Sequence, residues 1–465
     1  MAGARALTRG EAGAGVHWRS RPGDLNPVAW WVHHTLWFLP VLGALLGALL
    51  GVLMVRPPGP LATVLRGVAW QASVQEARTM LSSVLGIALS SLSIVLSLSM
   101  LVVQNAAGQY SPRLLRLYLH SAGIRVVIPM FVATSVFCLV AAQLFGFVPG
   151  AGRQPRPALS LAMLMLVLCE ASLIFQVLET LQFMRVENLV RRVGRDTLRV
   201  ARRLEARRQN DLAPRPAPPP SSSTSWPLRA LENGFVADVD GRRLVAVAQE
   251  LGLVVHLDVT IGEPVTRGAV VGRVEPGGRG PAESREVAEA LLPALLMDRW
   301  RDLDSDVALG VRQLVDVAIK ALSPGINDPY TAVEVVDQLT FLLCAMSRMK
   351  LGPRVLPDAS GHPRVFLHAA TLQDYVSLAT DQILRYGAGE PAVVVRLLRL
   401  VGEVGQRARR PEDRHAAREA LRQIQAQAER ALTDTPWRER IRGHAEAAER
   451  ALEGEPLPAL PAIGF

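Results

Sequence analysis

The chain has 465 residues, of which 49% are hydrophobic and only 5% are aromatic, and this balance predicts membrane spans. The formal charge of +9 does not indicate a nucleic-acid partner, because the basic residues are almost all arginine, with lysine only at Lys320 and Lys350. Cys138, Cys169 and Cys344 are too few and too scattered for a disulfide framework or a zinc site. We therefore expect no metal and no cofactor.

Four apolar segments follow a polar tail that covers residues 1–28. They occupy residues 29–55, 80–103, 126–148 and 158–184, and each is close to the ~20 apolar residues that cross the hydrocarbon core. The predicted fold class is an α-helical membrane protein with four transmembrane helices. A C-terminal cytoplasmic α+β domain, with a small β module and a mostly helical part, is expected to follow.

The segment after the fourth span sets the expected orientation. Residues 185–212 read as a juxtamembrane helix that is rich in arginine and poor in acidic residues. Short loops with many arginines stay in the cytoplasm, so this helix is expected inside. Four crossings then place both the N-terminus and the C-terminus in the cytoplasm.

The second span contains small residues on one helical stripe. At about 100° per residue they fall on one side of a helix, where they either allow a second helix to approach closely or line a water-filled pore. The stripe consists of Ser83, Gly86, Ser90, Ser93 and Ser97. Gln104 and Asn105 follow at its expected inner mouth, which makes the serines and these two amides candidates for a pore or transport path.

Glu170 lies near the middle of the fourth span. A carboxylate at membrane depth is costly, so it usually faces protein or water and often marks the path of a proton or an ion. The alternative is a carboxyl group that is hydrogen-bonded inside the bundle. Glu170 is therefore a further candidate for a transport path.

The soluble half begins after a Pro/Ser-rich linker at residues 213–227. Residues 228–280 alternate in the manner of a small β module, and residues 281–465 read as mainly helical. Helices are predicted near residues 283–300, 305–323, 329–348, 371–387, 391–409 and 412–452, with a Pro-rich turn at 353–363. Arg312 and Asp316 share one helix face, as in a solvated row of ion pairs.

The stretch ALSPGINDPYTAVE, residues 321–334, separates two of these helices. Pro324 stops the first helix, Asp328 is a good N-cap, and Pro329 suits the first helical position of the next. The same segment also offers a helix N-terminus to an anion or oxygen ligands to a cation. The candidates for contacting a ligand or a subunit are Arg312, Asp316, Ser323, Asn327, Asp328 and Tyr330.

Four stretches carry a resemblance to a known family: RQLVDVAIKALSPGINDPYTAVEVVDQL, QNAAGQYSPRLLRLYL, GFVADVDGRRLVAVAQELGLVVHLDV and TDQILRYGAGEPAVVVRLLRL. They resemble the bacterial predicted membrane proteins described as domain of unknown function 2254. The resemblance implies four spans followed by a cytoplasmic domain, in the bacterial inner membrane, and it implies no particular activity.

The sequence contains no Gly-rich phosphate loop, nucleophile elbow or HExxH motif, so we do not expect an enzyme. The leading hypothesis is a homo-oligomeric ion channel or transporter in the lipid bilayer, controlled by a cytoplasmic regulatory domain. The alternative is a membrane-anchored ligand sensor or scaffold.

Overall fold

The computed structural model describes residues 38–59, 65, 67, 69–105, 122–148, 152–183, 185–213, 225–276 and 284–459. The chain divides into two compact units. The first unit includes Asp196–Gly310 and Ala345–Tyr375, and the second includes Gly23–Arg195, Val311–Cys344 and Val376–Phe465. The predicted tail at residues 1–28 lies outside the described residues, as does most of the predicted linker.

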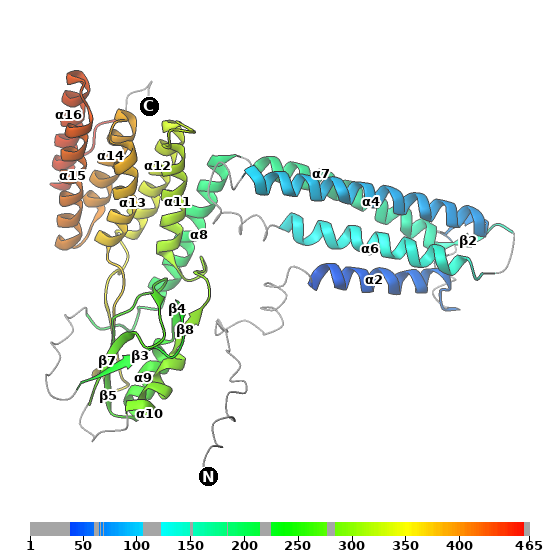
Figure 1. Cartoon of the computed structure of the whole chain (residues 1–465), viewed down its shortest axis with the longest axis horizontal. Helices are drawn as coiled ribbons and strands as arrows, with labels where there is room; N and C mark the ends of the chain where they lie inside the picture. Colours follow the sequence, from blue (N-terminus) through cyan, green and yellow to red (C-terminus); the bar gives the residue numbers. More distant parts are fainter. Residues whose placement is uncertain are drawn as a thin grey trace, which may run out of the picture. The chain divides into compact units, whose positions relative to one another are not determined.

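Four helices of the second unit are long and apolar enough to cross a membrane, which confirms the four predicted spans (Figure 1). They are α2 (Phe38–Val55), α4 (Val74–Asn105), α6 (Ala122–Phe145) and α7 (Pro157–Phe183). The second helix begins earlier than predicted, because Ser73 and Glu76 form a capping box: each side chain accepts a hydrogen bond from the backbone N–H of the other. Residues 29–37 of the first predicted span are not among those described.

α6 is the central helix of this bundle, since it contacts α2, α4 and α7. Its side chains Phe131, Phe137 and Phe145 are fully buried. Glycines on α2 allow a close approach of the two backbones: a Cβ atom at Gly47 would collide with the carbonyl oxygen of Ala133. This is the packing of small residues that membrane helices use in place of a hydrophobic driving force.

A two-stranded ribbon joins the segments next to two of the spans. β1 (Trp70–Ala72) pairs antiparallel with β2 (Gln154–Arg156). The Arg156 side chain is buried, donates a hydrogen bond of 3.4 Å to the carbonyl oxygen of Ala72, and lies 5.3 Å from the ring centroid of Phe145. The ribbon therefore ties the start of α4 to the start of α7.

The first unit is built on two small sheets. The five-stranded sheet has the order β3-β7-β5-β10-β9 and is antiparallel except for β5 and β10, which are parallel; the second sheet has the order β6-β4-β8. The strands are β3 (Trp226–Arg229), β4 (Gly234–Val239), β5 (Leu253–Leu257), β6 (Pro264–Val265), β7 (Val270–Pro276), β8 (Leu295–Asp298), β9 (Arg354–Pro357) and β10 (Pro363–Leu367).

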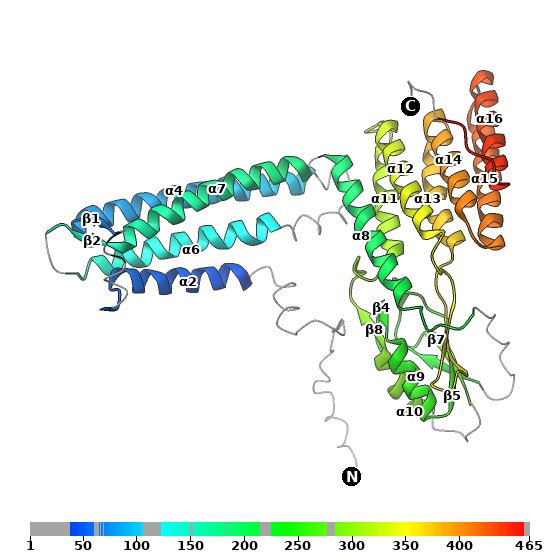
Figure 2. The ribbon, with the colours of Figure 1, turned by 180° about the vertical axis from the view of Figure 1, so that it is seen from behind.

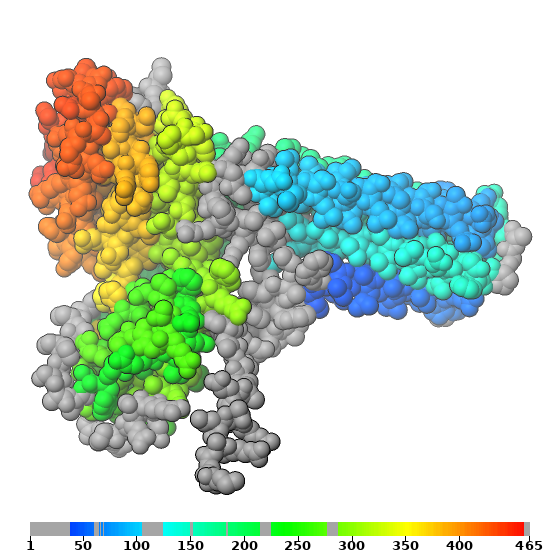
Figure 3. Space-filling model, viewed as in Figure 1, coloured from blue at the N-terminus to red at the C-terminus, as the bar shows by residue number. Residues whose placement is uncertain are grey.

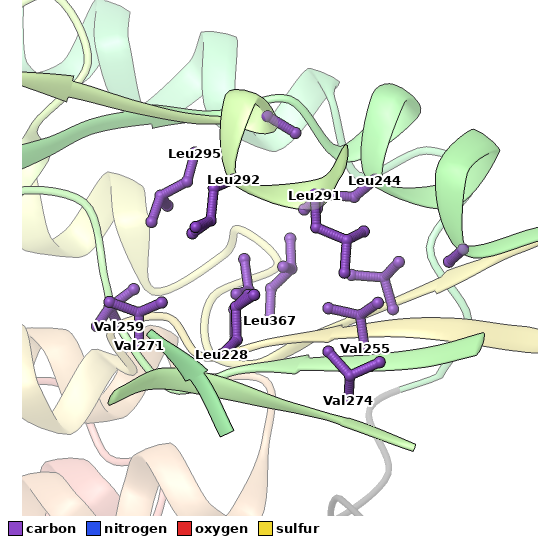
Figure 4. Packing of buried hydrophobic residues seen from close by; sticks show 14 of the residues in the cluster. Leu228, Leu244, Val255, Val259, Val271, Val274, Leu291, Leu292, Leu295 and Leu367 are labelled. Atoms are coloured by element: carbon purple, nitrogen blue, oxygen red, sulfur yellow. The ribbon is translucent and has the colours of Figure 1, made fainter. Parts of the chain in front are cut away.

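The core of this unit lies between the larger sheet and two helices, α9 (Gly241–Glu250) and α10 (Ser284–Leu291) (Figure 4). Val255 and Val274 point from the sheet toward Leu244 and Leu291 of the helices, and all four are buried. The alternation of valines and leucines along β5 and β7 supplies the buried face. The predicted β module is therefore present.

Two segments of this unit differ from the prediction. The region 353–363, expected to be a turn, contains the strand β9 and leads into β10. The region 283–300, expected to be one helix, forms α10, the 3-10 helix Leu292–Ala294 and the strand β8. Pro293 removes a backbone donor there, so the helix ends and an extended strand can pair with β4.

The remaining helices are α8 (Val186–Ala206), α11 (Val307–Ala321), α12 (Pro329–Met346), α13 (Leu372–Gly387), α14 (Pro391–Arg407), α15 (Pro411–Ala431) and α16 (Thr435–Leu452). In the second unit, α14 packs against both α15 and α16 (Figure 2). The predicted helix 412–452 is two helices, because a new helix starts after the extended Asp434, with a proline in its first turn.

Candidate functional site

The serine stripe of α4 faces away from the four-helix bundle. Its five members are exposed, whereas Leu81, Ala88 and Val95 on the other side of the helix are fully buried. Figure 3 shows α4, in light blue, along the surface of the bundle. A Cβ atom at Gly86 would meet nothing within 4 Å. No described segment of the same chain covers the stripe.

The hydroxyl groups of the stripe are satisfied within the helix. Ser90 Oγ donates a hydrogen bond of 2.9 Å to the carbonyl oxygen of Gly86, and Ser97 Oγ donates one of 2.9 Å to that of Ser93. Ser83 makes the same bond to Thr79 at 3.0 Å. Such local bonds let serine face either lipid or another helix at little cost, and its oxygen lone pairs still accept hydrogen bonds from water.

The two amides expected at the end of the stripe lie in its last turn. Gln104 is exposed and falls in the same angular sector as Gly86, because the 18 residues between them complete five helical turns at 3.6 residues per turn. Asn105 ends α4, and its side chain is not among the parts that the structure describes.

Glu170 lies inside the bundle, away from the stripe. Its Oε1 accepts a hydrogen bond of 2.8 Å from Ser91 Oγ, and Ser91 is only 7% exposed. The adjacent Cys169 is within 3.2 Å of the Thr134 hydroxyl. The structure therefore joins α4, α6 and α7 by a small polar cluster, and it does not bring Glu170 together with the stripe serines.

The turn between α11 and α12 uses most of its polar groups locally. Asp328 accepts hydrogen bonds from the Thr331 backbone N–H at 3.1 Å and from the Thr331 hydroxyl at 2.6 Å. Ser323 Oγ donates to the carbonyl oxygen of Lys320 at 2.6 Å. Asp328 is thus the predicted cap of α12, and both of its carboxylate oxygens are engaged.

Asn327 has φ of 52° and is the one non-glycine residue with positive φ within the described parts of the chain. Asparagine tolerates this left-handed conformation better than most residues, which explains its position here. Asn327 and Tyr330 are exposed, and Tyr330 has a relative exposure of 64%. These two side chains are therefore available for contact.

Arg312 and Asp316 form the predicted ion pair on α11. Arg312 Nε lies 3.1 Å from Asp316 Oδ1, one helical turn away. Arg312 is 39% exposed and Asp316 is 11% exposed. Exposed pairs of this kind contribute only a few tenths of a kcal/mol, about 0.3 to 0.5.

The first unit contains a pocket of about 140 Å³ that the sequence did not indicate. Its walls come from the end of α8, from loops of the β module and from the segments before α11 and α13. Apolar side chains such as Leu204, Val259 and Met346 form its floor, and Lys350 and His368 are exposed at its rim. This combination of an apolar floor with a few polar groups is typical of a small-molecule site.

The polar groups of this pocket are held by their neighbours. Burial and the nearby Asp306 carboxylate raise the pKa of Tyr375 to about 12. Arg207 lies 2.9 Å from Asp238, which fixes one wall. No cluster of three or more potential metal ligands occurs in the part of the chain that the structure describes.

Comparison with known proteins identifies the family. The profile of the predicted membrane proteins (DUF2254) matches residues 33–403. The chain belongs to this family. The match covers the helices α2, α4, α6 and α7, the parts Asp196–Gly310 and Ala345–Tyr375 of the first unit and the turn at residues 321–334, and it ends within α14.

Among relatives of this family member are uncharacterized proteins of Mycobacterium tuberculosis and Mycobacterium bovis. Each is 28% identical over 422 residues, which is 90% of this chain and 81% of the relative. No solved structure matches the chain. The family match thus confirms the resemblance predicted from the four sequence stretches.

The pocket and the Ser91–Glu170 pair were missed for different reasons. The pocket draws on residues from Ala201 to Tyr375, which no local pattern connects. Ser91 stands next to Ser90 in the sequence, but a step of one residue turns the side chain by about 100°, into the bundle. A carboxylate in the middle of a span, at Glu170, was a signal that a polar partner faces it.

Proposed function

We propose that the protein is a homo-oligomeric membrane channel in which the stripe of α4 faces other copies of the same helix around a path for ions. The observation that carries the proposal is the open serine and glycine face of a membrane-spanning helix, whose other face is packed inside its own bundle. Rings of hydroxyl groups and backbone carbonyls provide ion paths in membranes.

The exposed faces of α2 and α7 differ from the stripe of α4, and this difference supports the proposal. The exposed side chains of α2 are all large and aliphatic, and most of those of α7 are too, apart from Ala171, Phe175 and Gln182. The aliphatic ones include Val41, Leu45, Leu49 and Val52 on α2, and Leu164, Val167, Ile174 and Leu178 on α7. A stripe of small hydroxyl residues is not needed for contact with lipid, whereas it suits contact between helices or with water.

The proposed orientation in the membrane follows from the charges on α8. α8 follows the fourth span directly and carries exposed arginines such as Arg191, Arg195 and Arg202. By the positive-inside rule this helix lies in the cytoplasm, and so do both termini. The first unit is then a cytoplasmic regulatory domain of a protein in the bacterial inner membrane.

Thiol labelling in liposomes tests the water path. We expect Ser90→Cys and Ser93→Cys to react with a water-soluble thiol reagent, and the reaction to reduce ion flux. Ile87→Cys and Leu96→Cys, which are exposed on the two flanks of the stripe, are the matched controls and should stay unreactive. The parental chain measures any background from its own Cys344.

Two results contradict the channel. One is the absence of ion flux from liposomes that hold the purified chain under voltage, a pH gradient or membrane tension. The other is equal labelling of the stripe and flank positions, because lipid would then surround the stripe as it surrounds the rest of α4.

A second function, ligand sensing, is favoured by the pocket of the first unit. Its volume of about 140 Å³ suits a small molecule, and Lys350 at the rim provides a positive charge for a carboxylate. We expect a panel of small carboxylates to include one that raises the thermal stability of the full chain. Ala370→Leu, which fills the pocket, should abolish this shift, and Lys350→Gln should weaken it.

A further inference from the structure

The second unit contains a larger, positively charged pocket where the last span meets α8. Its volume is about 600 Å³. Three arginines of α8 line it, Arg191, Arg192 and Arg195, together with the amide side chains of Gln182, Asn188 and Gln338. Its polar lining therefore consists of groups that donate hydrogen bonds, and none of these side chains is acidic.

The position of this pocket relative to the span is fixed by Asn188. Its Nδ2 donates hydrogen bonds to Gln182 Oε1 at 2.8 Å and to the Gln182 carbonyl oxygen at 3.3 Å. Gln182 is the last residue of the part of α7 that is apolar enough to cross a membrane, Pro157–Gln182, and α8 begins at Val186. Arg195 is nine residues into α8, which is roughly 14 Å along the helix axis. The pocket thus starts at the depth of the lipid headgroups.

The charge of the pocket is only partly compensated. Neither Arg191 nor Arg195 forms a direct ion pair with a described residue. Acidic side chains also lie nearby: Glu334 and, around it, Glu187, Asp328 and Asp337. Burial and the Glu187 carboxylate raise the pKa of Glu334, while Arg191 opposes this shift. None of these carboxylates lines the pocket.

We propose that this pocket binds the phosphate group of an anionic phospholipid. Arginine presents a planar fork of N–H donors that matches phosphate oxygens, and the amide groups of Gln338 and Gln182 add donors for the rest of a headgroup. Basic pockets beside membrane helices bind anionic headgroups in this way. A soluble phosphate has the same chemistry, but the place of Gln182 at the end of the span favours lipid.

Native mass spectrometry of the full chain from nanodiscs tests this site. The nanodiscs hold phosphatidylcholine with phosphatidylglycerol, and the measured quantity is the phosphatidylglycerol retained per chain. We expect Arg191→Gln with Arg195→Gln to lower the apparent affinity about thirty-fold, since each arginine near the surface contributes about 1 kcal/mol. Gln338→Glu, which leaves the arginines in place, should also reduce retention.

The matched control is Arg199→Gln with Arg202→Gln, which removes the same charge from the same helix. Both residues are exposed, and neither lines the pocket. This control should retain phosphatidylglycerol like the parental chain. Equal loss in the two double variants would show only a general attraction of α8 to anionic membranes and would overturn the proposal, as would no loss in either.

Inorganic phosphate separates the two possible sources. It is titrated against the full chain in neutral detergent, with thermal stability as the readout. If lipid is the natural ligand, millimolar phosphate should raise the thermal stability of the full chain only slightly. Stabilisation that the pocket variant loses, without a change in phosphatidylglycerol retention, would keep the phosphate site but reject lipid as its ligand.

Discussion

α2 and α4 both carry small residues at helical spacing, yet only one of the two stripes is packed within the chain. On α2, Gly43 and Gly47 lie against the backbone of α6, where a Cβ atom would meet the carbonyl oxygens of Pro129 and Ala133. On α4, Gly86 has open space around it. The same sequence pattern therefore serves an internal contact in one helix and leaves a free surface on the other.

The two stripes differ in the type of small residue that they contain. The stripe of α2 contains glycine alone, at Gly43, Gly47 and Gly51, which lets two backbones meet. The stripe of α4 contains mostly serine, whose side chains need slightly more room and can accept hydrogen bonds from water. Glycine at every fourth residue of α2 thus marks the closest contact between helices of the bundle, whereas the serines of α4 lie on an exposed face.

Gly47→Leu is expected to have the largest effect. Its side chain has no room beside Ala133, so we expect a loss of roughly 3 kcal/mol in stability, at the upper end for overpacking. Thermal unfolding of the purified chain in detergent measures this loss. Gly86→Leu is the matched control and should unfold like the parental chain. Equal stability of the two variants would contradict the packing of α2 on α6.

Gly86→Leu should instead act on the contact between copies. A bulky side chain in the stripe holds neighbouring helices apart, so we expect self-association in nanodiscs to weaken by about 1 kcal/mol, or about five-fold. Chemical crosslinking as a function of the protein-to-lipid ratio measures it. Unchanged association would show that α4 does not contact another copy.

Ser91→Ala and Ser90→Ala compare the two sides of α4 at neighbouring positions. Ser91 holds Glu170 inside the bundle, so its loss should cost about 0.6 to 1.7 kcal/mol, the range for hydrogen bonds between membrane helices. Ser90 bonds only to its own backbone, so its loss should have almost no effect on unfolding. Unfolding in detergent tests both. An equal cost would place both hydroxyl groups in similar surroundings.

Asn327→Gly should have the smallest effect. Asn327 has a φ of 52°, a backbone conformation that glycine adopts without strain. The change should therefore alter the free energy of unfolding by less than about 0.5 kcal/mol. If channel flux falls while the melting temperature stays constant, the amide contacts a ligand or a subunit. If both stay constant, the residue serves the turn alone.

The spans and the cap of α12 were predictable because their signals are local. A run of twenty apolar residues predicts a span, and the sequence Ser-Pro-Gly-Ile-Asn-Asp-Pro predicts a turn and a helix cap, without any contact to a distant part of the chain. The strand β10 was not predictable, because one of its pairing partners is far away in the sequence: Val365 of β10 lies beside Val255 of β5. β9 pairs with β10, so its place in the sheet depends on the same long-range contact. The pocket of the first unit is likewise assembled from distant segments, whereas the pocket beside α8 draws on the arginine-rich segment after the fourth span and on Gln338 alone from elsewhere.

The parallel pairing of β5 with β10 also matters while the chain is being made. β10 leaves the ribosome about 100 residues after β5, which is roughly 5–20 s at usual rates of synthesis. During that time one edge of β5 has no partner, and an unpaired edge is where strands of different chains join. A chain that stops between the two strands would therefore present this edge permanently, which makes truncated products more prone to aggregate than the finished protein.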